Sequence, residues 1–246
     1  MRSKISLIFV FLLAVTIEAP RAFGQQTSVF VSPIPNVPFM AIVNAQRSQI
    51  LPDGTTRNLK SIHAIARDSQ GQIFNDARTW VPSTSNDSPV ILMMHMYDPQ
   101  TRLNTLLYPK QHIAVQKTLL QPPSTEPPVL FATPAANSAP VNQLVKEEDL
   151  GTRTMEGVPA HGVRETQTIA ADDSGTGNEV QVVDEYWYSE DLRIDMLIKH
   201  SDPRSGDLIR TVTHVSRTDP DPVIFTVPSD YKVIGRRAPS TAQKTN

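Results

Sequence analysis

The sequence predicts a mainly β protein: a strongly curved antiparallel sheet, a half-barrel or open barrel, built from hairpins with few short helices. Short segments with alternating apolar and polar residues recur along the chain, and turns rich in Gly, Pro, Asn and Asp separate them. Almost no stretch has helical periodicity. The clearest region is 150–233, where strand-like segments and sharp turns follow one another. A β-sandwich is the alternative arrangement.

The first 24 residues have the parts of a cleavable secretory signal. Arg2 and Lys4 precede an apolar run over residues 5–17, and small residues follow near Gly24. This run is short for a bilayer span, so we expect cleavage after Gly24 and a periplasmic or secreted protein, with a retained anchor as the alternative. Residues 25–38 contain three prolines and no periodicity, which predicts a flexible N-terminal arm.

The composition narrows the classes of partner. The chain has 23 basic and 25 acidic residues, and its first 24 residues hold three basic residues and one acidic residue, so 20 and 24 remain, a net charge of −4. Such mild acidity without a dense basic block argues against nucleic acid or an anionic membrane as the main partner. There is no cysteine, which excludes disulfides, thiolate metal ligands and a thiol nucleophile. No later apolar stretch is long enough to cross a membrane, so no stable span is expected after signal cleavage.

The first hairpin is expected from residues 39–51 and 55–68. Residues 52–54 between them read Pro-Asp-Gly, a turn in which the glycine supplies a positive φ. A further turn at 69–71 leads into a strand over 72–80.

A second group of strands follows a polar loop at 81–89. Residues 90–97 and 103–108 form a hairpin about an Asp-Pro turn, and 111–120 adds another strand. The methionines of the first of these strands are expected to serve as adaptable core residues, although soft Met surfaces also suit variable apolar ligands.

The middle of the chain contains a proline-rich loop over 121–140, with six prolines in 20 residues. That density of missing N–H groups excludes a helix or a strand ladder. We expect one β domain over 39–233 with this loop inserted, and a disordered tail over 234–246. Residues 141–148 are either a short helix or a strand.

The C-terminal strands bring polar residues together. Residues 160–169 and 180–188 flank a polar loop and form a hairpin, and symmetric pairing places Arg164 opposite Glu185. Pairing across the turn at 189–191 then puts Trp187 near Leu192 and Glu185 near Ile194.

The next hairpin, from 192–200 and 208–217, completes the predicted site. Symmetric pairing puts His214 beside Ile194, on the face of Glu185 and Arg164. This predicts a small polar site in an apolar concavity, with Arg164 holding an anionic group. A structural ion pair with a satisfied histidine is the alternative. The ligand-binding candidates are Arg164, Glu185, His214, Trp187 and Met196.

Several elements of 150–233 resemble a group of exported, uncharacterised β-rich proteins of Acidobacteria-like bacteria. The resemblance lies in Leu150-Gly151, Glu185 with Trp187-Tyr188-Ser189, Asp202-Pro203-Arg204, and Pro220-Asp221-Pro222 with Phe225, Pro228 and Tyr231. The order of hairpins and the Phe-x-x-Pro-x-x-Tyr end are also similar, more weakly, to the half-barrel of periplasmic lipoprotein carriers. That second resemblance implies a curved sheet whose concave side holds acyl chains. Neither group supplies catalytic residues.

Searches for catalytic and cofactor motifs give nothing. The sequence has no P-loop, dinucleotide fingerprint, His-Glu-x-x-His motif or Gly-x-Ser-x-Gly elbow. Its six histidines stand singly, and the acidic residues of 171–179 lack the spacing of a calcium loop. We therefore expect no cofactor, no metal and no catalytic residue, with a hydrolase using Glu185 and His214 as a minor alternative.

The sequence thus predicts an exported non-enzymatic protein that binds a lipid or other apolar ligand on the concave face of a curved sheet. The alternative is a structural or protein-interaction module of the cell envelope, with an envelope protein as partner.

Overall fold

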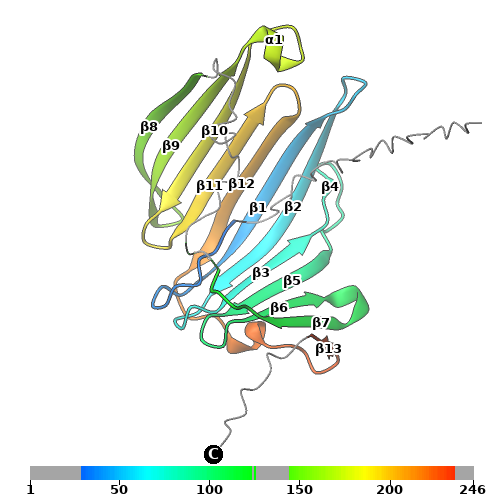
Figure 1. Ribbon diagram of the computed structural model, residues 1–246, viewed down its shortest axis with the longest axis vertical. Helices are drawn as coiled ribbons and strands as arrows, with labels where there is room; N and C mark the ends of the chain where they lie inside the picture. The colour runs from blue at the N-terminus through cyan, green and yellow to red at the C-terminus, as the bar shows by residue number, and fades with distance from the viewer. Residues whose placement is uncertain (1–28, 124, 126–143, 236–246) are drawn as a thin grey trace, which may run out of the picture.

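The protein folds as one open, curved sheet with very few helices, as the sequence predicts (Figure 1). The computed structural model describes residues 29–123, 125 and 144–235. The expected signal at 1–24, most of the proline-rich loop and nearly all of the tail lie outside the described residues. The strands are β1 (Phe39–Ile50), β2 (Thr56–Arg67), β3 (Ile73–Arg78), β4 (Val81–Pro82), β5 (Ile91–Asp98), β6 (Leu103–Tyr108), β7 (Ile113–Thr118), β8 (Leu144–Met155), β9 (Val158–Ile169), β10 (Val180–Ser189), β11 (Ile194–Asp202), β12 (Gly206–Ser216) and β13 (Lys232–Ile234).

The strand order is β13-β7-β6-β5-β3-β2-β1-β12-β11-β10-β9-β8, with β4 paired to β2. Neighbouring strands are antiparallel except β13, which runs parallel to β7. The centre of the sheet joins the two halves of the chain, because β1 pairs with β2 on one side and with β12 on the other. The described strands form one sheet, so the β-sandwich alternative is wrong.

The first hairpin forms as predicted. Each residue of β1 pairs with one of β2, from Phe39 with Arg67 to Ile50 with Thr56. At the turn, Gly54 has a φ of 81°, and the Asp53 carboxylate accepts a 2.9 Å hydrogen bond from the Thr55 N–H. A short polar side chain followed by glycine satisfies this turn locally, which is why the sequence identifies it.

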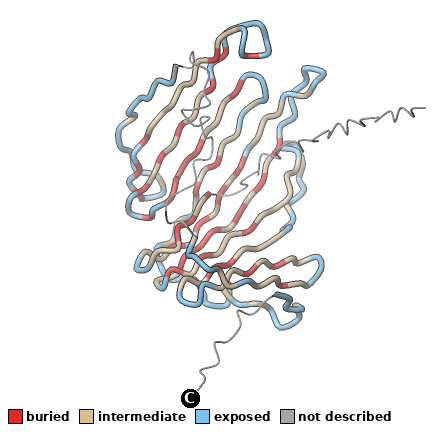
Figure 2. Tube along the Cα trace, in the orientation of Figure 1, coloured by how far each residue is buried: buried red, intermediate tan, exposed pale blue. Residues whose placement is uncertain are grey.

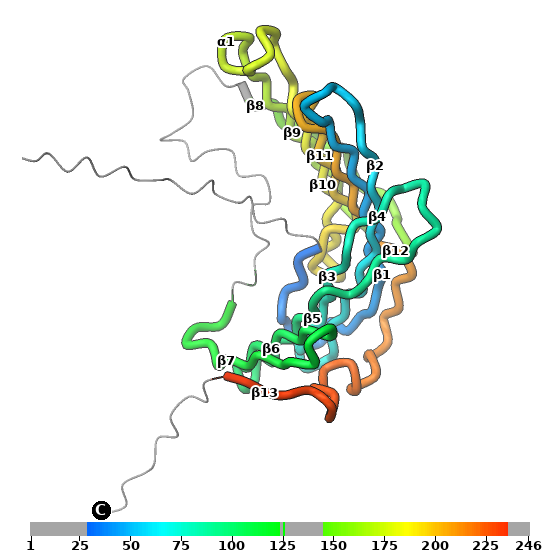
Figure 3. Tube along the Cα trace, turned by 90° about the vertical axis from the view of Figure 1, so that its right-hand side faces the viewer, coloured from blue at the N-terminus to red at the C-terminus, as the bar shows by residue number. Residues whose placement is uncertain are grey.

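The sheet bends so that β5, β6 and β7 project to one side of the long strands (Figure 3). The segment before β1 lies on the inside of this curve, which we call the concave face. There Arg67 donates to the backbone oxygens of Ser32 and Val37, both at 2.8 Å. Val29 and Val31 are buried in the same region, so these residues are packed rather than loose as their prolines led us to expect.

Buried residues lie along the strands of the sheet (Figure 2), and most of the buried hydrophobic residues form two clusters. The larger cluster contains Phe39, Ala41 and Val43 of β1 together with Val29 and Val31. The smaller one lies on the convex face, where Trp187 and Leu197 of the larger cluster also lie. Its buried members are Met96, Leu107 and Ala114, and Phe74, Met94, Val227 and Tyr231 pack against them. Met94 and Met96 therefore serve as core residues.

The structure defines three local segments more closely than the sequence does. Residues from 144 onward form strand β8, which decides between the helix and the strand left open for 141–148. The polar loop after β9 contains a four-residue helix, α1 (Ala171–Ser174), ended by Gly175 with a φ of 74°. The apolar stretch after β12 forms a 3-10 turn over Pro222–Phe225, where Asp221 caps the Val223 N–H at 2.9 Å. In the last two cases a left-handed glycine or a local side-chain hydrogen bond favours the observed structure.

Candidate functional site

Strand pairing defines which side chains share the concave face. Alternate residues of a strand point to opposite faces, and directly paired residues point to the same face. Arg67 contacts the segment inside the curve, so its partner Phe39 and the alternate residues Ala41, Val43 and Ala45 face the concave side. Their partners on β2 and β12 continue this face across the sheet.

The lower part of the concave face belongs to the packed core. Val43 of β1 pairs with Val212 of β12, and Ile65 of β2 lies in the adjacent row, beside Ala41. Each of Val43, Val212 and Ile65 is at most 1% exposed. They share the larger core cluster with Val29 and Val31. This part of the face is therefore occupied by the chain itself.

The upper part of the concave face carries a second set of apolar side chains. These residues are buried but belong to neither core cluster of the described residues. We call them the upper concave surface: Ala45, Leu59, Ile169, Val180, Val182 and Ile198. Each of them is at most 7% exposed, although it belongs to neither cluster.

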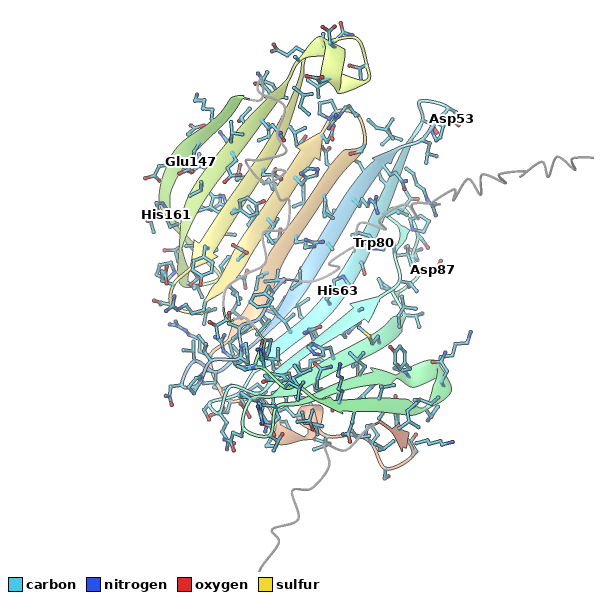
Figure 4. The ribbon with its side chains drawn as sticks, viewed as in Figure 1. Asp53, His63, Trp80, Asp87, Glu147 and His161 are labelled. Atoms are coloured by element: carbon cyan, nitrogen blue, oxygen red, sulfur yellow. The ribbon has the colours of Figure 1, made fainter. Side chains whose placement is uncertain are left out.

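Two basic side chains stand where the core meets this surface. His63 pairs with Val43, and Arg210 pairs with Ala45, so both point to the concave side. His63 is fully buried and Arg210 is 4% exposed. Figure 4 shows His63 near the middle of the sheet. Basic groups are thus placed among apolar neighbours at the centre of the concave face.

Burial controls the ionisation of these two groups. It lowers the pKa of the Arg210 guanidinium to about 10, which leaves it protonated at neutral pH. Burial is also the main cause that lowers the pKa of His63. The carboxylate of Asp76 opposes this shift, and the charge of Arg210 adds to it. His63 is therefore neutral at pH 7.

An acidic rim lies on the same face towards β8. Pairing aligns Glu147, Glu165 and Asp184 across β8, β9 and β10, and Asp184 is 2.7 Å from His200 Nδ1. Burial, followed by the charges of Asp184 and Glu147, raises the pKa of Glu165. Figure 4 shows Glu147 and His161 at this edge of the sheet. The concave face thus changes from apolar and basic at its centre to acidic at the β8 edge.

Three of the residues predicted from sequence come together on the convex face. Arg164 and Glu185 pair directly, as predicted, and Arg164 Nη2 donates to the Glu185 carboxylate at 3.0 Å. Trp187 Nε1 donates to the same carboxylate at 2.7 Å, and Lys199 Nζ does so at 3.1 Å. The burial of Glu185 would raise its pKa, but these three donors outweigh it and lower the pKa to about 2. This is a well-satisfied ion-pair network.

The other two predicted residues lie elsewhere, and the expected convergence is wrong. The sequence predicted Trp187 near Leu192, but Trp187 pairs with Leu197. Glu185 therefore pairs with Lys199 and does not lie near Ile194. Met196, one residue from Leu197, therefore points to the concave face. His214 is exposed, has a φ of 55°, and its ring lies 3.1 Å from Thr213 Oγ1. A bulge at this point of β12 removes it from the regular ladder.

The tip of the β8–β9 hairpin covers Trp187. The Glu156 carboxylate at this tip accepts a 2.8 Å hydrogen bond from the His214 N–H on β12, although β10 and β11 lie between β9 and β12. The tip therefore folds back over the convex face. The Arg153 guanidinium stacks 3.7 Å from the Trp187 ring. The network around Glu185 thus joins this tip to the sheet.

Comparisons with known proteins give likenesses of fold only. No family model matches the chain, and no curated protein does. A conserved protein from Thermus thermophilus is similar in structure at 10% identity and a TM-score of 0.40, over 82% of this chain and 91% of the other. MucB of Pseudomonas aeruginosa in complex with MucA gives 10% identity and a TM-score of 0.39, over 80% of this chain and 58% of the other.

The similar structures also include a member of the LolA superfamily. A LolA-superfamily protein from Nitrosomonas europaea is 12% identical with a TM-score of 0.31, over 78% of this chain and 91% of the other. None of them bears on the resemblance to the Acidobacteria-like group. At these identities they do not define a function.

Sequence reasoning did not identify Arg210 or His63 as site residues. Their convergence depends on the pairing of β1 with β12, which joins segments more than 150 residues apart in the chain. A usable signal was present: an arginine and a histidine stand at inward positions of alternating strands, where a buried polar group needs partners. Across the described residues, no group of three or more His, Asp or Glu is placed to hold a metal ion. No helix in the same residues is long and apolar enough to cross a membrane.

Proposed function

We propose that this protein is an exported, non-enzymatic protein that binds a lipid or another apolar ligand on the concave face of its sheet. The upper concave surface carries the proposal. It presents buried apolar side chains that the two core clusters of the described residues do not use. An apolar sheet face requires a covering layer. In the described residues, the only α-helix is the four-residue α1, so no helical layer supplies that cover there.

The residues that would contact the ligand follow from the pairing. Ala45, Leu59 and Ile198 lie on three of the four central strands. Arg164, Glu185 and Trp187 lie on the opposite face, and His214 lies at the bulge of β12, so they are not included. Met196 is on the concave face but is fully buried in the larger core cluster, so the proposal keeps none of the residues of the predicted site.

Export is part of this proposal. It is supported by the basic start and short apolar run of residues 1–24. A protein exported in this way would meet lipids of the cell envelope. Mass spectrometry of the secreted or periplasmic protein should give an N-terminus at Gln25.

The decisive test is ligand uptake by the delipidated protein. Native mass spectrometry before delipidation should detect a bound acyl species, and N-phenyl-1-naphthylamine, a neutral fluorescent probe, should bind afterwards. The double variant Leu59→Thr/Ile198→Thr should weaken probe binding by about tenfold, because it removes apolar surface from the concave face. Absence of both the acyl species and probe uptake would show that the proposal is wrong.

A matched control uses apolar residues of the convex face. Ile62 pairs with Asn44 and Ile209 pairs with Gln46, so both point away from the concave side. Ile62→Thr/Ile209→Thr should change probe affinity by less than about twofold, because it leaves the apolar area of the concave face unchanged. Should the concave double variant fail to fold, Ala45→Phe tests the same surface by adding bulk instead of removing it. Equal probe loss in the concave and convex variants would contradict the proposed location.

A further inference from the structure

Asp195 on β11 is a buried carboxylate without a partner among the described residues. It is 8% exposed, and no hydrogen bond or ion pair reaches it from the part of the chain that the structure describes. Burial is the only cause that raises its pKa to about 6, so the group is ionised at pH 7 and no neighbouring charge of those residues compensates it. An uncompensated buried charge is costly for folding. A ligand group of opposite charge would remove this cost.

A β-bulge turns Asp195 from the convex to the concave face. The pairs on the two sides of the bulge are Trp187–Leu197 and Tyr188–Asp195, so β11 has one extra residue between them. Without that residue, Asp195 would share the convex face with Leu197, because alternate residues of a strand point the same way. With it, Asp195 shares the concave face with its partner Tyr188. Bulges often redirect a side chain next to a functional site.

Tyr186 stands near Asp195 on the same face. It pairs with Ile198, a residue of the upper concave surface, and its hydroxyl makes no hydrogen bond to a described residue. Burial, followed by the charges of Asp184, Glu165 and Asp195, raises the pKa of Tyr186 well above its ordinary value. No basic group among the described residues opposes this shift. The Tyr186 hydroxyl therefore lies in a negative potential at the border of the apolar surface.

We propose that Asp195 and Tyr186 bind the ammonium head group of a cationic amphiphile whose hydrocarbon chain lies on the upper concave surface. This inference rests on the proposed function and adds the chemical class of the ligand. A carboxylate pairs with an ammonium group, and the faces of tyrosine rings attract such cations, most strongly where water is excluded. Tyr186 and Tyr188 both present a ring on this face, because they are alternate residues of β10. The hydrocarbon chain continues over Ile198, the cross-strand partner of Tyr186.

The acidic rim favours a cation on this side of the concave face. Asp184 is two residues from Tyr186 on β10, and Glu165 pairs with Asp184 across the β9–β10 ladder. Next to burial, the charges of Asp184 and Glu147 raise the pKa of Glu165, so added positive charge is favoured there. An amphiphile with an anionic head group has the opposite preference.

The test compares ligands with one chain and different head groups. Dodecylamine, dodecyltrimethylammonium, dodecanol and dodecanoate compete with N-phenyl-1-naphthylamine for the delipidated protein, each below its solubility limit and its critical micelle concentration. At least one of the two cations should displace the probe at a concentration about tenfold or more below that of dodecanol. The two cations decide between a primary and a quaternary ammonium group.

Variants assign the head-group preference to a residue. Asp195→Asn should retain probe uptake and lose the preference for the cation over dodecanol. Its matched control, Asp191→Asn, removes the same charge from a half-exposed carboxylate that pairs with Arg217 at 3.0 Å, and it should keep the preference. Tyr186→Leu should reduce the preference about threefold, because it removes the ring and keeps an apolar side chain. Loss of the preference in both Asp variants would assign it to the overall negative charge and overturn the site.

The outcomes separate this inference from the proposed function. Failure of the probe and of all four ligands to bind would overturn both. Probe uptake with equal displacement by the cations and dodecanol in the natural protein would overturn only the head-group site, and this result needs no variant. A cation preference that Asp195→Asn retains would also overturn it. If that variant does not fold, an unchanged preference in Tyr186→Leu would have the same meaning.

Discussion

Glu185 accepts a 3.0 Å hydrogen bond from Arg164 across the β9–β10 ladder, on the convex face of the sheet. The same carboxylate also accepts from Trp187 and Lys199, so one buried group connects three strands. The network lies on the convex face, whereas His63 and Arg210 point to the concave face. The convex polar residues therefore join strands of the sheet and take no part in the proposed ligand surface.

The first prediction concerns Glu185→Gln. The pKa of Glu185 is about 2 in the folded protein, below its ordinary value of 4.5, so the charged form stabilises the fold above pH 4.5. That contribution is lost as the pH falls from 4.5 through 2. The substitution should therefore lower the free energy of unfolding at pH 7 by about 2 kcal/mol, with a smaller difference below pH 4. Urea unfolding at several pH values measures this.

A matched control for Glu185 is the other carboxylate that contacts Arg164. Glu148 lies 3.3 Å from Arg164 and is about half exposed. Glu148→Gln should change stability by less than about 0.5 kcal/mol. Equal effects of the two substitutions would contradict a special role for the buried carboxylate.

The second prediction is that Asp195→Asn stabilises the protein at neutral pH. Asp195 is 8% exposed, and burial raises its pKa from 3.8 to about 6. The unfolded chain ionises this group more easily, so the natural protein loses stability as the pH rises from 3.8 to 6. The variant should gain up to about 3 kcal/mol above pH 6 and little below pH 4. Thermal unfolding across this range tests the sign.

Asp191→Asn is the control for that experiment. Asp191 is about half exposed and pairs with Arg217 at 3.0 Å. Its replacement should leave the pH dependence of unfolding almost unchanged, because surface pairs contribute little. A stabilising effect of Asp195→Asn that is as large at pH 3 as at pH 7 would contradict the ionisation argument.

Sequence reasoning succeeded where pairing is local. The Pro-Asp-Gly turn fixed the β1–β2 hairpin, and symmetry about the polar loop paired Arg164 with Glu185. It failed at the β10–β11 turn, where Ser189 O accepts from Arg193 N at 2.7 Å and Arg193 has a φ of 55°. This longer turn, with a bulge after Trp187, changes the register from Trp187–Leu192 to Trp187–Leu197. An odd shift moves Met196 to the other face.

The third prediction is that Gly162→Ala destabilises the tip of the β8–β9 hairpin. A Cβ at this position would lie 2.8 Å from three ring atoms of Trp187, which is closer than carbon atoms pack. The ring cannot move freely, because Arg153 stacks on it and its Nε1 donates to Glu185. The expected loss is about 1–3 kcal/mol by thermal or urea unfolding.

Trp187 itself supplies the control for Gly162. The chain has two tryptophans, so Trp80→Phe leaves Trp187 as the single indole fluorophore. The fluorescence of this variant then reports a displacement of the Trp187 ring by Gly162→Ala. In a Trp187→Leu background, Gly162→Ala should lower the free energy of unfolding much less than it does beside the natural Trp187. A full cost in both backgrounds would exclude the steric cause.

The last prediction concerns Arg67, whose guanidinium joins three separate segments. It donates to Ser32 O and Val37 O at 2.8 Å and to Leu192 O at 2.6 Å, and it is fully buried over the Phe39 ring. Arg67→Met removes all three donors, so it should cost at least about 3 kcal/mol. It should also make the chain sensitive to chymotrypsin at Phe30. Arg102→Met, which removes one bond from an exposed arginine to Leu120 O, is the control and should affect neither measurement.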